Sequence, residues 1–242
     1  IFFGGLNKSD YQDSEGHDRK SYGLPYQQDR VITALTKANK NFIYVNISGN
    51  AVEMPWVKQV PAIVQGWFIG SQAGVALASV LVGDANPSGK LPYTWFKTLN
   101  DVPAHRLNSY PGTWRADKKV IDETYKEGIF VGYRWVDKDK TKPLFAFGHG
   151  LSYTSFDLSN LRLSQKKITE NDQLTATVTV KNTGRRAGAE VVQLYVSDLK
   201  SSLLRPKKEL KGFKKVYLAP GETKDVDITI DRSALSFYHD KL

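Results

Sequence analysis

The chain begins with Ile1-Phe2-Phe3-Gly4-Gly5-Leu6 and soon continues with Asp13-Ser14-Glu15-Gly16-His17-Asp18-Arg19. The apolar run predicts a buried strand, and the polar stretch predicts a loop at its end. Ligands of layered α/β domains bind at loops beyond the strand ends. Glu15 is therefore our candidate for proton chemistry, since Gly16 lets the chain turn sharply and the charged neighbours offer local contacts that could hold the loop.

Strand and helix patterns alternate from this run to residue 104. Helices are predicted after Pro25 and over 70–82, strands over 42–45, 62–68 and 91–96. Two sets of apolar residues are expected to face the core from these helices, namely Val31, Ile32, Leu35 and Ala38, and Val75, Leu77, Ala78 and Leu81. The alternation predicts an α/β domain with a mostly parallel sheet and right-handed crossovers.

The rest of the chain changes character twice. Residues 105–150 lack a clean period and predict a long interdomain connection, in which 129–136 stands out as a strand. Residues 151–242 show short alternating strands separated by turn signals, which is typical of an antiparallel β-sandwich of the immunoglobulin or fibronectin type. We expect about six strands where a complete sandwich has about seven, so the last strand is predicted to be missing.

Composition limits the class of protein. The length of 242 residues suits two domains of roughly 100 residues each. The absence of cysteine excludes disulfides and cysteine metal sites, and no apolar stretch approaches the ~20 residues of a membrane span. The net charge of +9, with its basic cluster at 205–215, is interpreted as a solvated lysine-rich surface, because no nucleic-acid-binding module is recognisable. The chain opens directly in a strand and stops abruptly, so we interpret it as part of a longer protein.

Seven sequence blocks carry a family resemblance through their order and spacing. They are Ser14–Arg19, Gly49–Trp56, Gly66–Trp67 with Gly70–Gly74, Gly83–Pro92, Tyr125–Tyr133, Phe145–Tyr153 and Gly188–Tyr195. Together they make essentially the whole chain resemble the C-terminal half of the family 3 glycoside hydrolases, the β-glucosidase family. Each block alone is a modest signal, whereas the joint pattern is specific.

The resemblance implies a domain plan and a residue role. Enzymes of this family carry an N-terminal (β/α)8 barrel, an α/β sandwich domain and a fibronectin-III-like domain. Residues 1–104 would be most of the second domain, a three-layer α/β sandwich with a mostly parallel sheet that is incomplete at its N-terminus. Residues 151–242 would be most of the third, with 105–150 connecting the two. The Ser-Glu-Gly motif matches the loop that supplies the general acid/base, which assigns that role to Glu15. The nucleophilic aspartate would lie in the absent barrel.

The implied reaction is the removal of terminal non-reducing β-D-glucosyl residues with retention of configuration. The expected partners are a β-linked gluco-oligosaccharide or an aryl or alkyl β-glucoside, and the barrel domain of the same protein. No cofactor and no catalytic metal are expected. The expected location is periplasmic or secreted. Substrate-binding residues are not identified, and homo-oligomerisation stays open.

Two alternative functions stay open. The protein could be a β-xylosidase or another exo-glycosidase of the same family, because sugar selectivity is set mostly by barrel residues. It could also be a non-catalytic carbohydrate-binding or adhesion module, since a fold does not fix a function.

Several other side chains are considered for functional roles besides Glu15. Asp10 and Asp13 lie nearby but outside the Ser-Glu-Gly frame, and His17 is expected to be a hydrogen-bonding loop residue. Tyr133 and Trp135 could stack on a sugar, although packing on the second domain is favoured because buried aromatics mainly supply apolar area. Two glycosylation sequons, at Asn7 and Asn46, are the kind of short match that recurs by chance.

Overall fold

The computed structural model of the chain describes residues 1–238, and its contacts form two compact units. Unit 1 contains Ile1–Val82, Trp95–Glu127 and Lys142–Phe145. Unit 2 contains Gly83–Thr94, Gly128–Thr141 and the chain from Ala146 onward. No helix in the described part is long and apolar enough to cross a membrane. The predicted domain boundaries at 104 and 150 stay predictions.

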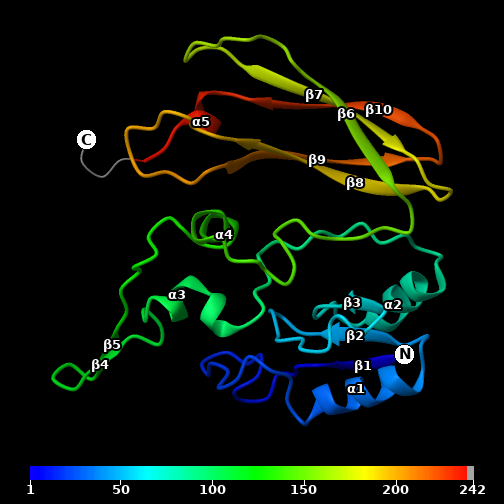
Figure 1. The fold of residues 1–242 in the computed structure, drawn as a ribbon, viewed down its shortest axis with the longest axis vertical. Coiled ribbons are helices and arrows are strands. Elements are labelled where there is room, and N and C mark those ends of the chain that lie inside the picture. Colours follow the sequence, from blue (N-terminus) through cyan, green and yellow to red (C-terminus); the bar gives the residue numbers. More distant parts are fainter. Residues whose placement is uncertain (239–242) are drawn as a thin grey trace. The chain divides into compact units, whose positions relative to one another are not determined.

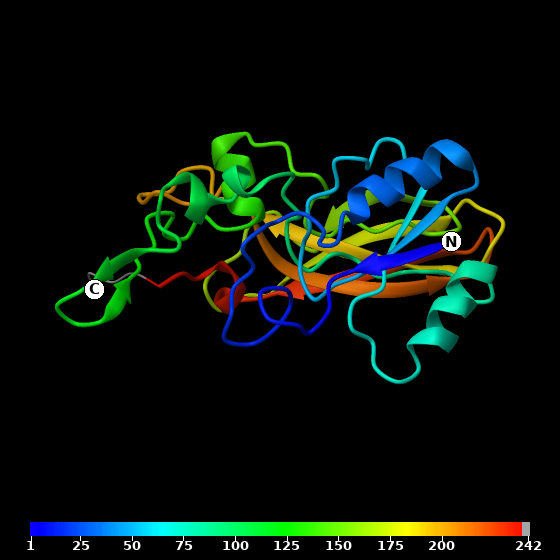
Figure 2. The ribbon, with the colours of Figure 1, turned by 90° about the horizontal axis from the view of Figure 1, so that it is seen from below.

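A parallel sheet forms the centre of unit 1. Its strands are β1 (Phe2–Gly5), β2 (Ile43–Ile47) and β3 (Ala62–Gln65), hydrogen-bonded in the order β1-β2-β3 (Figure 1). Tyr44 and Val45 of β2 are completely buried, as expected for an apolar strand covered on both faces. Figure 2 shows α1 (Gln28–Ala38) and α2 (Ala73–Val82) on opposite sides of this sheet. The predicted α/β class is thus confirmed.

The predicted core faces of the two helices are only partly right. Ile32 of α1 and Leu77 of α2 are buried, whereas Val31 is 42% and Val75 66% exposed. Phe3 of β1 is exposed as well, because β1 lies at an edge of the described sheet. Three strands cover only a narrow stripe of each helix, so residues flanking that stripe stay in contact with solvent.

Asn46 fixes the end of β2. Its side chain is fully buried, accepts a hydrogen bond from the Tyr44 hydroxyl (2.8 Å) and donates to Ser48 Oγ (2.8 Å) and Gln65 Oε1 (2.6 Å). A glycan on Asn46 would require this network to be dismantled, so the sequon there is not a usable site in the folded protein. The network also holds the chain where it leaves β2.

The connecting segments differ most from the sequence prediction. In unit 1, η1 (Leu99–Asp101) and α3 (Pro103–Arg106) precede an antiparallel hairpin of β4 (Thr113–Arg115) and β5 (Val120–Asp122). The predicted strand over 129–136 is wrong, because α4 (Tyr133–Asp139) begins within it. Gly128 and Gly132 adopt positive φ values of 56° and 55°, which glycine tolerates and which interrupt an extended chain.

The predicted strand over 91–96 is also wrong. Only one isolated bridge forms in this segment, between Trp95 and Phe145. Pro92 lacks the backbone N–H that a sheet ladder needs, which explains why the apolar run does not continue as a strand. The Leu91 amide instead donates to the His149 carbonyl (2.8 Å), and the Gly148 amide donates to the Leu91 carbonyl (2.8 Å).

Unit 2 contains the predicted β-sandwich. One sheet has the order β10-β7-β6, with β6 (Phe156–Leu163), β7 (Leu174–Asn182) and β10 (Thr223–Ile230), and the other pairs β8 (Gly188–Val196) with β9 (Glu209–Leu218). Their inner faces share a core of Val180, Val226, Ile228, Val192 and Leu218. Five strands are present in the described part of this region, one fewer than predicted. The unit closes with α5 (Arg232–Leu235), capped by the Asp231 side chain.

Candidate active site

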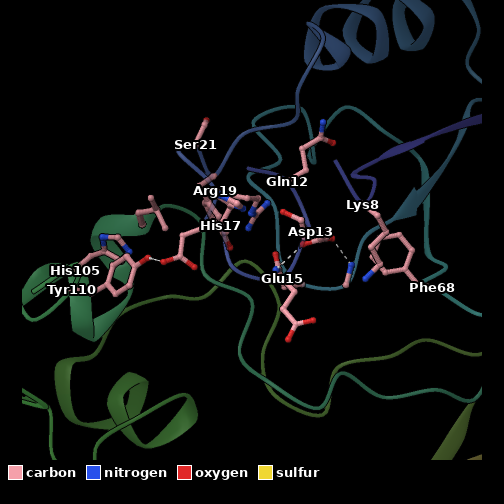
Figure 3. Close-up of a pocket in the computed structure, with 16 residues that line it drawn as sticks. Lys8, Gln12, Asp13, Glu15, His17, Arg19, Ser21, Phe68, His105 and Tyr110 are labelled. Carbon is pink, nitrogen blue, oxygen red and sulfur yellow. Dashed lines mark hydrogen bonds between the residues drawn. The ribbon is translucent and has the colours of Figure 1, made fainter. Parts of the chain in front are cut away.

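The loop that carries Glu15 lies where the parallel strands of unit 1 end. We call residues 7–19, which follow β1, the Glu15 loop. It lines a cavity of about 500 Å³ together with Gly49 and Asn50, which follow β2, and Phe68, which follows β3 (Figure 3). His105 and Tyr110 complete one side of the cavity. The site therefore occupies the edge of the sheet at which α/β domains bind ligands.

The first half of the Glu15 loop is closed by its own hydrogen bonds. The Asn7 amide donates to Gln12 Oε1 (3.1 Å), and the Asp13 amide donates to the Asn7 carbonyl (3.0 Å). Asn7 Oδ1 in turn accepts from the Ser9 amide (2.7 Å). Residues 7–13 thus form a compact turn. The sequence of this stretch shows neither the hydrophobic period of a helix nor that of a strand, so the turn was not predicted.

Glu15 itself is exposed at the tip of the next turn. Its side chain extends away from Asp13 and Arg19 (Figure 3). Within residues 1–238, no side chain or backbone group forms a hydrogen bond or ion pair with its carboxylate. Gly16 has φ 81°, the left-handed conformation that the predicted sharp turn requires. The carboxylate is accordingly free to meet a group from outside the described chain.

The charged residues around Glu15 hold the loop in place. Asp13 Oδ2 accepts from the Gly49 amide (2.7 Å), and Asp13 Oδ1 accepts from Asn50 Nδ2 (2.8 Å). Arg19 Nη2 donates to the Ala51 carbonyl (2.6 Å). The sequence predicts local contacts for the charged neighbours of Glu15, but the contact of Arg19 is with a residue 32 positions away. The contacts of Asp13, with residues 36 and 37 positions away, were not predicted.

Asp18 holds the far side of the site. Its carboxylate accepts a short hydrogen bond from the Tyr110 hydroxyl, whose ring lies 5.2 Å from that of His105. This bond, helped by burial and by the charges of Asp18 and Glu123, raises the pKa of Tyr110 to about 12. The phenol therefore keeps its proton at neutral pH and acts as a hydrogen-bond donor.

His17 belongs to the surface of the loop. Its ring makes an edge contact with Tyr11, with centroids 5.1 Å apart, and its Nδ1 lies 4.0 Å from Asp10 Oδ1. No group of three or more His, Asp or Glu side chains in the described chain is arranged to hold a metal ion. His17 thus packs on the surface of the loop. A hydrogen-bonding role was predicted for it, whereas its described contacts are with a ring and a carboxylate.

Tyr133 and Trp135 are packing residues of unit 2. Trp135 is buried, and the Tyr133 ring contacts those of Phe147 (5.2 Å) and Tyr195 (5.7 Å). The Tyr133 hydroxyl also accepts from the Leu210 amide (2.9 Å). Packing was the favoured prediction, but the partners described here lie in and beside the β-sandwich, not in the α/β unit that we expected.

Comparison with known proteins identifies both parts of the chain. Residues 1–133 match the model of the glycosyl hydrolase family 3 C-terminal domain, and residues 190–242 match that of the fibronectin type III-like domain. Among curated proteins, beta-glucosidase BoGH3A of Bacteroides ovatus is 52% identical over 100% of this chain and 32% of its own length. Thermostable beta-glucosidase B of Acetivibrio thermocellus is 45% identical over 100% of this chain and 31% of its own length.

Solved structures agree with these matches. The beta-glucosidase DesR of Streptomyces venezuelae, in complex with D-glucose, has a TM-score of 0.88 and 42% identity, covering 98% of this chain and 29% of its own. The beta-glucosidase of Kluyveromyces marxianus, in complex with glucose, has a TM-score of 0.83 and 43% identity, covering 94% and 26%. The chain thus spans about a third of the length of its curated relatives.

Proposed function

This chain belongs to glycosyl hydrolase family 3, and we propose that it is the C-terminal part of a retaining exo-β-glucosidase in which Glu15 is the general acid/base. The full protein would release terminal non-reducing β-D-glucosyl residues from oligosaccharides or from aryl and alkyl β-glucosides. The observation that carries the proposal is the placement of Glu15, an unpaired carboxylate on a held loop at the ligand-binding edge of the sheet. The β-glucosidase relatives support the substrate class.

The proposed chemistry needs two carboxyl groups about 5–5.5 Å apart. An aspartate of a preceding (β/α)8 barrel attacks the anomeric carbon and forms a glycosyl-enzyme ester. Glu15 gives its proton to the glycosidic oxygen as the bond to the leaving group breaks. Glu15 then takes a proton from the water that attacks the ester, so that glucose leaves with the β configuration and both carboxyl groups regain their starting states.

In this proposal the two catalytic carboxyl groups lie on different domains, which accounts for the exposure of Glu15 in this chain. A carboxylate that must reach a nucleophile on another domain has to project from its own, and its loop has to be held without covering the carboxylate. Asp13, Asp18 and Arg19 satisfy this requirement because each binds a neighbouring segment and none binds Glu15.

The isolated chain is expected to be inactive. Purified residues 1–242 should hydrolyse nitrophenyl β-glucoside no faster than buffer, because one carboxyl group cannot perform both the attack and the proton transfer. The measurement compares this chain with the full-length enzyme at equal molar concentration. Robust turnover by the chain alone would show that the nucleophile lies within residues 1–242 and that the two-domain assignment of the pair is wrong.

The sugar specificity can be tested with the full-length enzyme on a panel of nitrophenyl glycosides. We expect the largest kcat/KM for the β-glucoside, with the β-xyloside, β-galactoside and α-glucoside well below it. A preference for the β-xyloside would leave Glu15 in its role but make the protein a β-xylosidase. Failure to cleave any glycoside would favour a non-catalytic carbohydrate-binding role.

A further inference from the structure

The residues on either side of Glu15, Asp13 and Arg19, both form hydrogen bonds with one neighbouring segment. On its N-terminal side, the Asp13 carboxylate accepts hydrogen bonds from Gly49 and Asn50, at 2.7 and 2.8 Å. On its C-terminal side, Arg19 donates to the Ala51 carbonyl at 2.6 Å. The three partner residues are consecutive, so residues 14–18 form a short bridge whose two ends are fixed to the same segment, 49–51.

The segment 49–51 is itself held by hydrogen bonds to the end of the sheet. Ser48 is fully buried, and its hydroxyl donates to the Asn50 carbonyl (2.7 Å). Gln65 Nε2, at the end of β3, donates to the Ser48 carbonyl (2.9 Å), while Asn46 Nδ2 donates to Ser48 Oγ (2.8 Å). Through these bonds the position of Gly49 and Asn50 is set by the central strands of the sheet, and Asp13 transmits that position to the loop.

From these contacts we propose that Asp13 is a positioning residue, which sets where the Glu15 carboxylate stands relative to the substrate. The inference rests on the proposed function, because it gives Asp13 a role only if Glu15 transfers a proton. Asp13 lies two residues from Glu15 and accepts two hydrogen bonds as a carboxylate, which are stronger than bonds between neutral groups. A displacement of about 1 Å at a reacting group can cost on the order of 10²-fold in rate.

The chemistry of the contact allows a test that swaps its partners. Asp13 offers acceptors only, and its two partners offer an N–H each. Asn50→Asp places a second carboxylate where a 2.8 Å hydrogen bond stood, and the two charges repel. Adding Asp13→Asn restores the contact, since the new amide oxygen can accept from Gly49 and its amide nitrogen can donate to the new carboxylate.

The experiment uses the full-length enzyme and two substrates that differ in their need for an acid. Dinitrophenyl β-glucoside has a leaving group that departs without a proton, whereas phenyl β-glucoside requires one. For phenyl β-glucoside, we expect Asp13→Ala and Asn50→Asp each to lower kcat/KM by about 10–100-fold. For dinitrophenyl β-glucoside the change should stay within about 3-fold, because its cleavage needs no proton.

The double variant Asp13→Asn with Asn50→Asp should recover most of the loss on phenyl β-glucoside. Asp10→Asn is the matched control, because Asp10 is an exposed acid of the same loop whose described contact is with His17 at 4.0 Å. This variant should leave kcat/KM unchanged for both substrates. A purely structural role of Asp13 would lower kcat/KM equally for both substrates, because it would reduce the amount of folded enzyme.

Two results would overturn the inference. One is that Asp13→Ala and Asn50→Asp lower kcat/KM equally for both substrates or do not lower it for either. The other is a double variant that is no better than Asn50→Asp alone. Glu15→Ala, measured beside them, separates this failure from that of the proposed function. If Glu15→Ala distinguishes the two substrates and the Asp13 variants do not, only the positioning role is wrong; if Glu15→Ala does not distinguish them either, the acid/base assignment is wrong.

Discussion

Glu15→Ala in the full-length enzyme is expected to lower kcat/KM for phenyl β-glucoside by about 10²–10⁴-fold, the usual contribution of a general acid. The value for dinitrophenyl β-glucoside should change little, since its leaving group needs no proton. The kcat for the activated substrate should nevertheless fall, because the second step, attack of water on the glycosyl-enzyme, also uses Glu15. Initial rates over a range of substrate concentrations for both glucosides measure these effects.

The structure makes this variant easy to interpret. Glu15 is exposed and has no partner in residues 1–238, and surface substitutions of this kind usually change stability by no more than about 0.5 kcal/mol. The unfolding temperature of Glu15→Ala should therefore match that of the unmodified enzyme, and any kinetic loss reflects chemistry. Equal kcat/KM values for the variant and the unmodified enzyme on phenyl β-glucoside would contradict the assignment.

The largest expected effect on stability comes from Asn182, at the end of β7. Its side chain is fully buried and donates through Nδ2 to the carbonyls of Arg186 (2.8 Å) and Leu218 (3.1 Å). Its Oδ1 accepts from Thr154 Oγ1 (2.7 Å) and the Gly184 amide (3.0 Å). All four hydrogen-bonding positions of the amide are thus occupied.

Asn182→Asp has nearly the same shape but replaces the two donors by an acceptor and adds a buried charge. We expect a loss of roughly 3–5 kcal/mol in the unfolding free energy of the sandwich, as for other uncompensated buried charges. The loss should shrink at low pH, where the new carboxyl is protonated in the folded state and can donate one bond. Hydrogen exchange of the β7 and β10 amides measures the opening free energy of this unit separately from the rest.

Asn160→Asp provides the matched control for Asn182→Asp. Asn160 lies in β6 of the same sheet, is exposed and adopts φ 53°, a left-handed conformation that aspartate also tolerates. The same chemical change there should alter the exchange of these amides very little. Similar losses in the two variants would mean that the hydrogen bonds of Asn182 do not hold the sandwich together.

Apolar and alternating runs predicted strands correctly where the backbone stays extended, and failed where glycines with positive φ turn it. The apolar run at 42–45 became the buried strand β2, and the alternation at 174–180 became β7 with Val180 in the sandwich core. The apolar run at 129–136 suggested a strand as well, yet Gly128 and Gly132 turn the backbone and α4 begins after them. The sequence shows these glycines but not the sign of their φ angles.

The sequence singles out Glu15, whose role as acid/base stays a prediction, but it does not reveal the side chains that hold the Glu15 loop. The Ser-Glu-Gly motif predicts the acid/base role for Glu15, whereas Asp13 was weighed only as a rival acid. Its contact with Gly49 and Asn50 joins residues 36 and 37 positions apart. Asp18 and Tyr110 are 92 positions apart. Such pairs follow from the pairing of β1 with β2 and from the course of the connection after residue 96, which no local pattern specifies. The contact of Asp13 with Gly49 and Asn50 could have been suspected from the sequence, because these residues lie in loops that follow two adjacent parallel strands.

Azide tests the central claim, that Glu15 is the acid/base of a two-step mechanism. Full-length Glu15→Ala is incubated with dinitrophenyl β-glucoside and sodium azide, and the products are identified by nuclear magnetic resonance. We predict that azide, a nucleophile that needs no general base, raises the turnover and yields β-glucosyl azide, while the unmodified enzyme yields glucose. Unchanged turnover without a glucosyl azide, or an azide of α configuration, would contradict the account.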